Sequence, residues 1–212
     1  IMQYAFVLGR VYTLSIAELM AILEKPDPTL NLTEEPIKIL EASEEILIIE
    51  TQGALHLDKL QKRLGGVIKI LQIIDCVKKR PQDSVNFALK HYFRPSTLKK
   101  YFLKDYKGKI QIGLSVYLLD VSLARRQPAN NGQKPEINIF SEPKRIGMMI
   151  KKALVDTGLS VRLVLPEFNS LSLASVVVTK NLLLQKGAEI CLLAGEEKVY
   201  VAKTLTVQDF ED

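Results

Sequence analysis

The sequence predicts an α+β fold made of two successive units, and three observations support this. Strand-like and helix-like segments follow the order strand, helix, strand, strand, helix, strand over residues 1–77. Strands and helices alternate again over residues 110–212, after a basic stretch that contains many aromatic residues. Apolar residues make up 47% of the 212 positions and charged residues 25%, which is the range of globular proteins able to bury a core.

The first unit opens with a buried strand and an amphipathic helix. Residues 4–8 form a short apolar run, which is typical of a buried strand. Apolar residues then recur with helical spacing up to Leu23, and Ser15 with Glu18 fits an N-terminal capping box. Pro26 and Pro28 end this helix, because proline cannot continue it.

A hairpin, a short helix and a last strand complete this unit. They are predicted at residues 37–51, 57–64 and 67–77. The pair Gly65-Gly66 follows the helix, where glycine is favoured as a cap. Six elements in this order are what a ferredoxin-like α+β unit needs to cover one face of its sheet with two helices, so we predict a first domain at residues 1–77.

Residues 78–109 are predicted to form a basic helical connector. Residues 58–109 hold fourteen Lys and Arg against four Asp and Glu, whereas residues 1–57 hold three against nine. Such an excess favours polyanions, because each neutralised phosphate releases condensed counterions. The candidate phosphate contacts of the connector are Lys78, Lys79, Arg80, Lys99 and Lys100.

The second unit is predicted at residues 110–212. It begins with a strand at residues 110–119 and continues through a polar loop at residues 125–135. The order helix, strand, helix, strand, strand follows.

Motifs for catalysis are missing from the sequence. The eleven glycines never form Gly-x-Gly, which a nucleotide or methyl-donor loop would need, and the serines near Ser172 lie in no Gly-x-Ser-x-Gly elbow. His56 and His91 have no second ligand at helical spacing, and Cys76 and Cys191 form no Cys-x-x-Cys pair. We therefore expect a binding protein with no metal, no bound cofactor and no disulfide.

The sequence also lacks the features of membrane and secreted proteins. No apolar run approaches the length of a membrane span, and the first residues lack the order of a signal peptide. We expect a cytoplasmic protein that does not enter membranes.

The helix predicted from Pro143 onward gives the strongest binding signal. Apolar residues fall on one face of it, and Lys144, Arg145, Lys151 and Lys152 project from the other. A charged outer face is also expected of any half-buried helix, so the stripe alone does not establish a function. Arg162 strengthens the hypothesis, since it follows among apolar neighbours of the next strand.

A second group of candidates surrounds the next predicted helix. A helix N-terminus can hold a phosphate or ribose oxygen, although a serine there is also an ordinary cap. The candidates of this group are Ser172, Ser175, Lys180 and Asn181.

The sequence resembles a family at these positions. Pro143-Lys144-Arg145-Ile146-Gly147, Gly158-Leu159-Ser160-Val161-Arg162 and Leu171-Ser172-Leu173-Ala174-Ser175-Val176 resemble the THUMP region of the archaeal-type tRNA guanine-N2 methyltransferases. The ferredoxin-like domain that precedes THUMP in the same family is resembled by Leu8-Gly9-Arg10 with Leu14-Ser15-Ile16-Ala17-Glu18-Leu19, and by Leu64-Gly65-Gly66-Val67-Ile68-Lys69-Ile70.

The resemblance implies a THUMP domain at residues 110–212 and tRNA as the partner. In this family THUMP grips the acceptor end of tRNA, and a C-terminal domain methylates a guanosine with S-adenosylmethionine. The Asp/Asn-Pro-Pro-Tyr motif of that domain is absent here, since the sequence has no Pro-Pro pair. We therefore expect S-adenosylmethionine and the methyltransferase domain to lie outside this sequence.

Two alternatives stay open. A THUMP region also serves other RNA modifications, such as thiolation or deamination. A protein-interaction scaffold, in which the positive charge is merely solubilising, is the alternative from another class of function.

Overall fold

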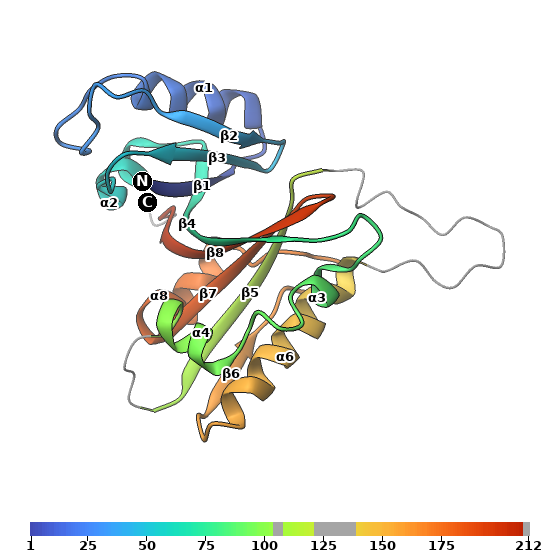
Figure 1. The fold of residues 1–212 in the computed structure, drawn as a ribbon. Helices are drawn as coiled ribbons and strands as arrows, with labels where there is room; N and C mark the ends of the chain where they lie inside the picture. The colour runs from blue at the N-terminus through green and yellow to red at the C-terminus, as the bar shows by residue number, and fades with distance from the viewer. Residues whose placement is uncertain (104–107, 121–138, 210–212) are drawn as a thin grey trace.

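The computed structural model describes residues 1–103, 108–120 and 139–209, and it has an α+β fold. Its strands form one mixed eight-stranded sheet in the order β2-β3-β1-β4-β8-β7-β5-β6. Helices cover this sheet on both of its faces (Figure 1). The polar loop predicted at residues 125–135 lies outside the described residues.

The first half of the sheet is antiparallel throughout. Its elements are β1 (Met2–Leu8), α1 (Tyr12–Leu23), β2 (Lys38–Ala42), β3 (Ile46–Thr51), α2 (Leu57–Arg63) and β4 (Val67–Lys78). The predicted order of elements is confirmed, and the hairpin turn is closed by a bond from the Ser43 N–H to the Ile46 carbonyl. Alternate residues of β1, Tyr4, Phe6 and Leu8, pack under α1 and α2 because neighbouring strand residues face opposite sides.

The predicted capping box is wrong. Helix α1 begins at Tyr12, so Ser15 lies inside it and donates to the Val11 carbonyl. Glu18 reaches outward instead, and its carboxylate accepts the backbone N–H groups of Gly65 and Gly66 at 2.9 and 2.8 Å. The acidic side chain therefore joins α1 to the start of β4, which local spacing could not reveal.

The glycine pair also has another role than the predicted cap. Neither Gly65 nor Gly66 has the positive φ of a helix-terminating glycine. A Cβ on Gly66 would lie 2.7 Å from the Ser15 hydroxyl oxygen and 3.0 Å from the Ser15 Cα. Glycine is needed at this position because α1 crosses it closely.

The second half of the sheet contains parallel strands. Its elements are α3 (Val85–Ala88), α4 (Pro95–Tyr101), β5 (Ile110–Leu118), η1 (Ile139–Ser141), α6 (Glu142–Val155), β6 (Val161–Val164), α7 (Ser175–Lys180), α8 (Leu183–Lys186), β7 (Gly187–Ala194) and β8 (Lys198–Val207). Strand β5 runs parallel to both β6 and β7, and β8 returns antiparallel to β7. Parallel pairing explains why β5 and β7 are buried almost throughout.

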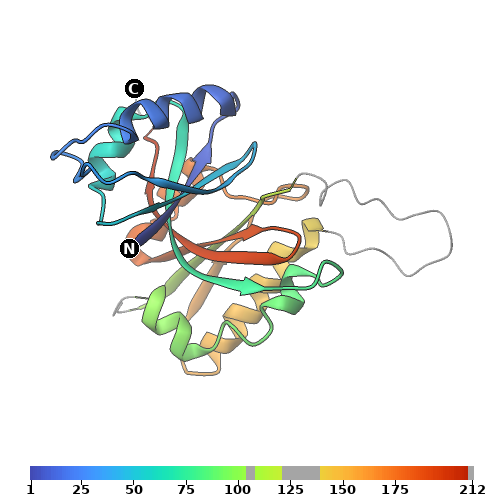
Figure 2. The ribbon, with the colours of Figure 1, turned by 45° about the horizontal axis from the view of Figure 1, so that its top comes forward.

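Helices α3, α4 and α6 lie together on one face of this half (Figures 1 and 2). Ile146, Ile150 and Leu154 of α6 are fully buried there, against apolar residues of β5, β7 and β8. Helices α7 and α8 cover the opposite face, where Val178 and Leu183 pack with Val164.

Strands β4 and β8 join the two halves. They pair from Lys69 with Val207 to Lys78 with Lys198, so the sheet continues past the predicted domain boundary at residue 77. The halves also meet across the sheet, because Ala5, Val7 and Ile48 share a buried cluster with Tyr117 and Leu193. The molecule therefore has one uninterrupted sheet with a shared interior.

Candidate nucleic-acid interface

The outer face of α6 carries the strongest predicted site. Lys144, Arg145 and Lys152 are exposed and Lys151 is half-buried, while the apolar back of the helix is in the core. Met148, 53% exposed, lies between the two pairs of charges. This amphipathic arrangement confirms the predicted orientation of the helix, since positions three and four apart share a face.

Positive charge extends from α6 over the neighbouring helices. We call this surface the basic helical face and define it by the Lys and Arg of residues 79–103 and 142–156. They are Lys79, Arg80, Lys90, Arg94, Lys99, Lys100, Lys144, Arg145, Lys151 and Lys152. The same segments hold only Asp83, Glu142 and Asp156 as acids. Lys99 and Lys100 thus lie on the same side of the sheet as the α6 stripe, because Leu98 and Phe102 of α4 pack in one cluster with Ile146 and Ile150 of α6.

Some of these charged side chains already interact with other groups of the molecule. Arg80 pairs with Asp83 at 3.1 Å, and the guanidinium lowers the pKa of that carboxyl through their hydrogen bond. The Lys79 ammonium donates to the Glu196 carbonyl at 2.6 Å, and the Lys100 ammonium lies 4.6 Å from the centre of the Tyr101 ring. Lys99 is exposed on α4 and is the connector residue best placed for a phosphate. Lys78 is also exposed, but it pairs with Lys198 at the end of β4 and faces the other side of the sheet, where Lys198 lies over the Tyr200 ring.

Glu142 fixes the helices of this face to one another. It is fully buried at the start of α6, and its carboxylate accepts the Asn86 backbone N–H at 2.6 Å. Burial raises the pKa of Glu142, whereas this hydrogen bond and the nearby Arg145 act in the opposite direction. The bond ties α3 to α6 and so holds the two parts of the basic helical face in register.

The remaining candidates lie on the other side of the sheet. Val161 and Leu163 pack on the α6 side, so Arg162 between them leaves the sheet on the face of α7 and α8. Arg162 is exposed, so its position between apolar residues of the strand does not bury its charge. Lys180, at the end of α7, is also exposed on that side.

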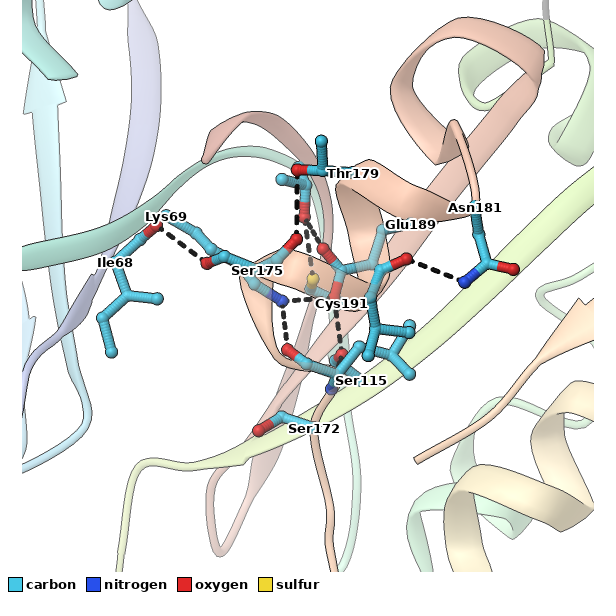
Figure 3. A network of polar contacts seen from close by, with 12 residues as sticks. Ile68, Lys69, Ser115, Ser172, Ser175, Thr179, Asn181, Glu189 and Cys191 are labelled. Carbon is cyan, nitrogen blue, oxygen red and sulfur yellow. Dashed lines mark hydrogen bonds and ion pairs between the residues drawn. The ribbon is translucent and has the colours of Figure 1, made fainter. Parts of the chain in front are cut away.

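Ser175 and Asn181 are engaged in internal hydrogen bonds (Figure 3). Helix α7 begins at Ser175 after Ala174, with no side-chain cap, so the predicted capping serine is wrong. Ser175 is buried and its hydroxyl donates to the Ile68 carbonyl at 3.4 Å. Asn181 donates to the Val177 carbonyl at 2.9 Å, and Ser172 is half-buried in the preceding loop.

A buried ionic network lies between the two halves of the molecule (Figure 3). The Lys69 ammonium of β4 donates to the Glu189 carboxylate of β7 and to the Leu173 carbonyl, both at 2.6 Å. The hydroxyl groups of Ser115 and Thr204 donate to the same carboxylate at 2.6 and 2.5 Å. Lys69 is 1% exposed and Glu189 is fully buried, so the pair is cut off from solvent.

Two neighbours of this network keep their protons. Burial raises the pKa of the Cys191 thiol and that of the Tyr117 hydroxyl well above their ordinary values. Cys191 is free, as is the exposed Cys76. The charges of the network are paired inside the core, so the network holds β4, β5, β7 and β8 together. It was not predicted from the sequence, although the signal was present as charged residues within apolar strands.

Over residues 1–103, 108–120 and 139–209, no three His, Cys, Asp or Glu side chains gather as metal ligands. Strand β7 ends at Ala194 and leads into a tight turn, in which the Gly195 N–H donates to the Lys198 carbonyl at 2.8 Å. Among the described helices, none combines the length and apolar character needed to span a bilayer.

Comparisons with known proteins concern the fold alone. No protein-family model and no curated protein matches the chain. Similar solved structures include TrmN from Thermus thermophilus, at 11% identity and a TM-score of 0.47, covering 98% of this chain and 46% of that one. PH1313 from Pyrococcus horikoshii is 12% identical with a TM-score of 0.45, covering 99% and 56%.

A third structure comes from Clostridium difficile and is described as a possible methylase. It is 10% identical with a TM-score of 0.46, covering 98% of this chain and 41% of that one. The chain thus spans about half the length, or less, of these structures. At these sequence identities the similarity concerns the fold alone.

Proposed function

We propose that this chain is the tRNA-binding region of an S-adenosylmethionine-dependent tRNA (guanine-N2) methyltransferase. The observation that carries the proposal is the basic helical face, where exposed positive charges from α4 and α6 lie on one side of the sheet. Surfaces of this kind bind phosphate backbones through counterion release. The sequence resemblance to THUMP proteins supplies tRNA as the polyanion.

The topology supports the finer assignment of the two units. The order β2-β3-β1-β4, antiparallel throughout and with two helices on one side, is that expected of a ferredoxin-like unit. We infer that residues 1–77 are such a unit and that residues 110–212 form a THUMP domain. The connector between them adds α3 and α4 to the face that α6 presents.

Within this proposal, the α6 side contacts the acceptor end of tRNA. Lys144, Arg145, Lys151 and Lys152 form the main contact, with Lys99 of α4 reaching a neighbouring phosphate. S-adenosylmethionine and the catalytic residues belong to a methyltransferase domain outside this sequence.

Binding to whole tRNA and to tRNA trimmed of its single-stranded acceptor end, each at two salt concentrations, tests the proposal. We expect salt-sensitive binding that weakens on trimming. In the variant K151E/K152E, the slope of log affinity against log salt should fall by about one for each lysine. The matched control is R162E/K180E on the opposite face, which should retain its affinity.

Unchanged affinity in K151E/K152E would exclude the basic helical face as the tRNA site. Loss only in R162E/K180E would move the site to the side of α7 and α8. The chain can then be fused to a methyltransferase domain, a thiolation domain or a deamination domain. The fusion that modifies the bound tRNA identifies the modification that the region serves.

A protein-interaction scaffold is the second candidate, because α1 has an apolar outer face. Val11 and Leu14 are 59% and 66% exposed, and Ala17 and Ala21 follow at helical spacing. Capture of a protein partner that is lost in L14E, without any affinity for tRNA, would favour this function over the first.

A further inference from the structure

Phe168 is the most exposed large apolar residue of the described chain. Its side chain is 95% exposed, in the loop that follows β6. A ring in this position is costly to leave in water and contributes nothing to the core, so the fold gives it no packing role.

The loop holds Phe168 in a defined turn. The Ser170 N–H donates to the Glu167 carbonyl at 3.0 Å, which makes Phe168 and Asn169 the two central residues of a β-turn. Asn169 has a φ of 65°, a left-handed conformation that asparagine tolerates well. The Ser170 hydroxyl bonds onward to the Ser172 carbonyl at 3.1 Å. The ring therefore stands at the tip of an ordered turn.

A groove of about 330 Å³ separates this turn from the start of α6. Pro166 and Phe168 line it from the turn, and Phe140, Pro143 and Lys144 line it from η1 and α6. The floor is thus largely apolar, and Phe140 offers a second aromatic ring, 42% exposed.

The charge around the groove is suited to an anion attached to a flat apolar group. Lys144 lines the groove and Arg145 follows it on α6, whose N-terminal end carries the positive pole of a fourteen-residue helix. Glu167 is the acid among the described lining residues, and Glu142 is buried beneath the helix start. An aromatic ring next to a basic stripe is how proteins bind single-stranded nucleic acid without reading its sequence.

We infer that an unpaired nucleobase stacks on Phe168 while its phosphate lies against Lys144 and Arg145. This inference rests on the proposed function and adds to it a stacking residue outside the positive stripe. The stacked base comes from a single strand, because a base inside a duplex has no free face.

The test compares single-stranded RNA with a blunt RNA duplex carrying the same number of phosphates. F168A should lose roughly 5- to 150-fold in affinity for the single strand, the range of one base stacked on an aromatic ring. F168A should bind the duplex as the original chain does. F87A is the matched control, because Phe87 is a 55% exposed ring on α3 of the basic helical face but outside the groove.

F168W gives a second and independent readout. The sequence contains no tryptophan, so this variant carries a single indole at the tip of the turn. Single-stranded RNA should quench its fluorescence and the duplex should not. F168L, which keeps an apolar side chain without a ring, should bind the single strand as weakly as F168A.

The outcomes separate this inference from the proposed function. RNA binding that is equal in F168A, F168L and the original chain, with no quenching in F168W, would overturn the stacking site and leave the basic helical face in place. An original chain that binds neither RNA contradicts both. An exposed ring that instead captures a protein partner, with RNA affinity unaffected, also overturns the stacking site.

Discussion

Lys69 and Glu189 face one another inside the sheet, and breaking this pair should be costly. In K69M the Glu189 carboxylate keeps its two hydroxyl donors but loses its counter-charge in a site without solvent. We expect the free energy of unfolding to fall by about 3–5 kcal/mol, the usual result of leaving one buried charge unpaired. Urea denaturation followed by circular dichroism measures this change.

Two companion variants identify the cause. K69M/E189L removes both charges and should recover most of the stability, because an apolar pair of similar volume can replace a buried ion pair. R63M breaks the exposed pair with Asp27, where Arg63 is 44% exposed, and should change stability far less. A K69M chain as stable as the original would show that the network does not hold the halves together.

Asp27 should make stability depend on acid pH. Hydrogen bonds from the Thr29 hydroxyl and from Arg63 lower the pKa of Asp27 from 3.8 to about 2. Since its folded pKa is depressed, the carboxylate stabilises the fold above the unfolded pKa, and this contribution is lost as pH falls toward 2. The stability difference between the original chain and D27N should therefore shrink from pH 5 to pH 2 in denaturant titrations. A difference that stays constant over this window would contradict the assignment.

The orientation of a side chain could be predicted from the sequence, but its distant partners could not. The lysines of α6 were predictable because helical spacing alone decides which face they occupy. The partners of Glu18 and Lys69 were not, since they lie 47 and 120 positions away along the chain. Ser175 was misjudged for the same reason, as its partner is the Ile68 carbonyl of a strand in the other half.

Helix α1 and the start of β4 depend on each other through Gly66. In G66A the new methyl group would press on the Ser15 Cα. A backbone atom cannot move away as the end of a flexible side chain can. We expect a loss of about 1–3 kcal/mol in the free energy of unfolding, as for other overpacked contacts. Thermal or denaturant unfolding measures it.

Gly65 provides the control for this prediction. Its Cβ would meet the Glu18 carboxylate at 3.6 Å, an ordinary contact, and its φ is not positive. G65A should therefore be close to neutral. Equal losses in G65A and G66A would mean that chain flexibility, not the crossing of α1, is what both glycines provide.

At this scale the elements themselves were largely predictable. Alternation and helical spacing gave the strands and the amphipathic α6 to within a few residues, because burial of one face imposes those periods. Helix ends were less predictable, and α1 begins three residues before the predicted serine cap. The residue before the helix, Val11, has no side chain that could cap it.

The continuous sheet should make the whole molecule unfold as one unit. Amides in the centres of β4 and β7 belong to different halves but share neighbours through β8. We therefore expect them to exchange with solvent at the same free energy of opening, measured by native-state hydrogen exchange. Faster exchange confined to β1–β4 would indicate that the first half opens on its own, as separate domains do.

The strand order was beyond the reach of the sequence. Nothing in the period of β8 shows that it pairs with β4 on one side and β7 on the other, with one partner more than a hundred positions away. Two units could therefore be predicted from their patterns, but not the sheet that unites them.

The position of β8 has a consequence for synthesis. This strand is made after all the others described, yet it lies between β4 and β7 in the middle of the sheet. While a ribosome is still translating the region before Lys198, β4 and β7 each have an exposed edge, and such edges invite pairing with other chains. A nascent chain of this protein should thus need protection by chaperones until β8 has left the exit tunnel.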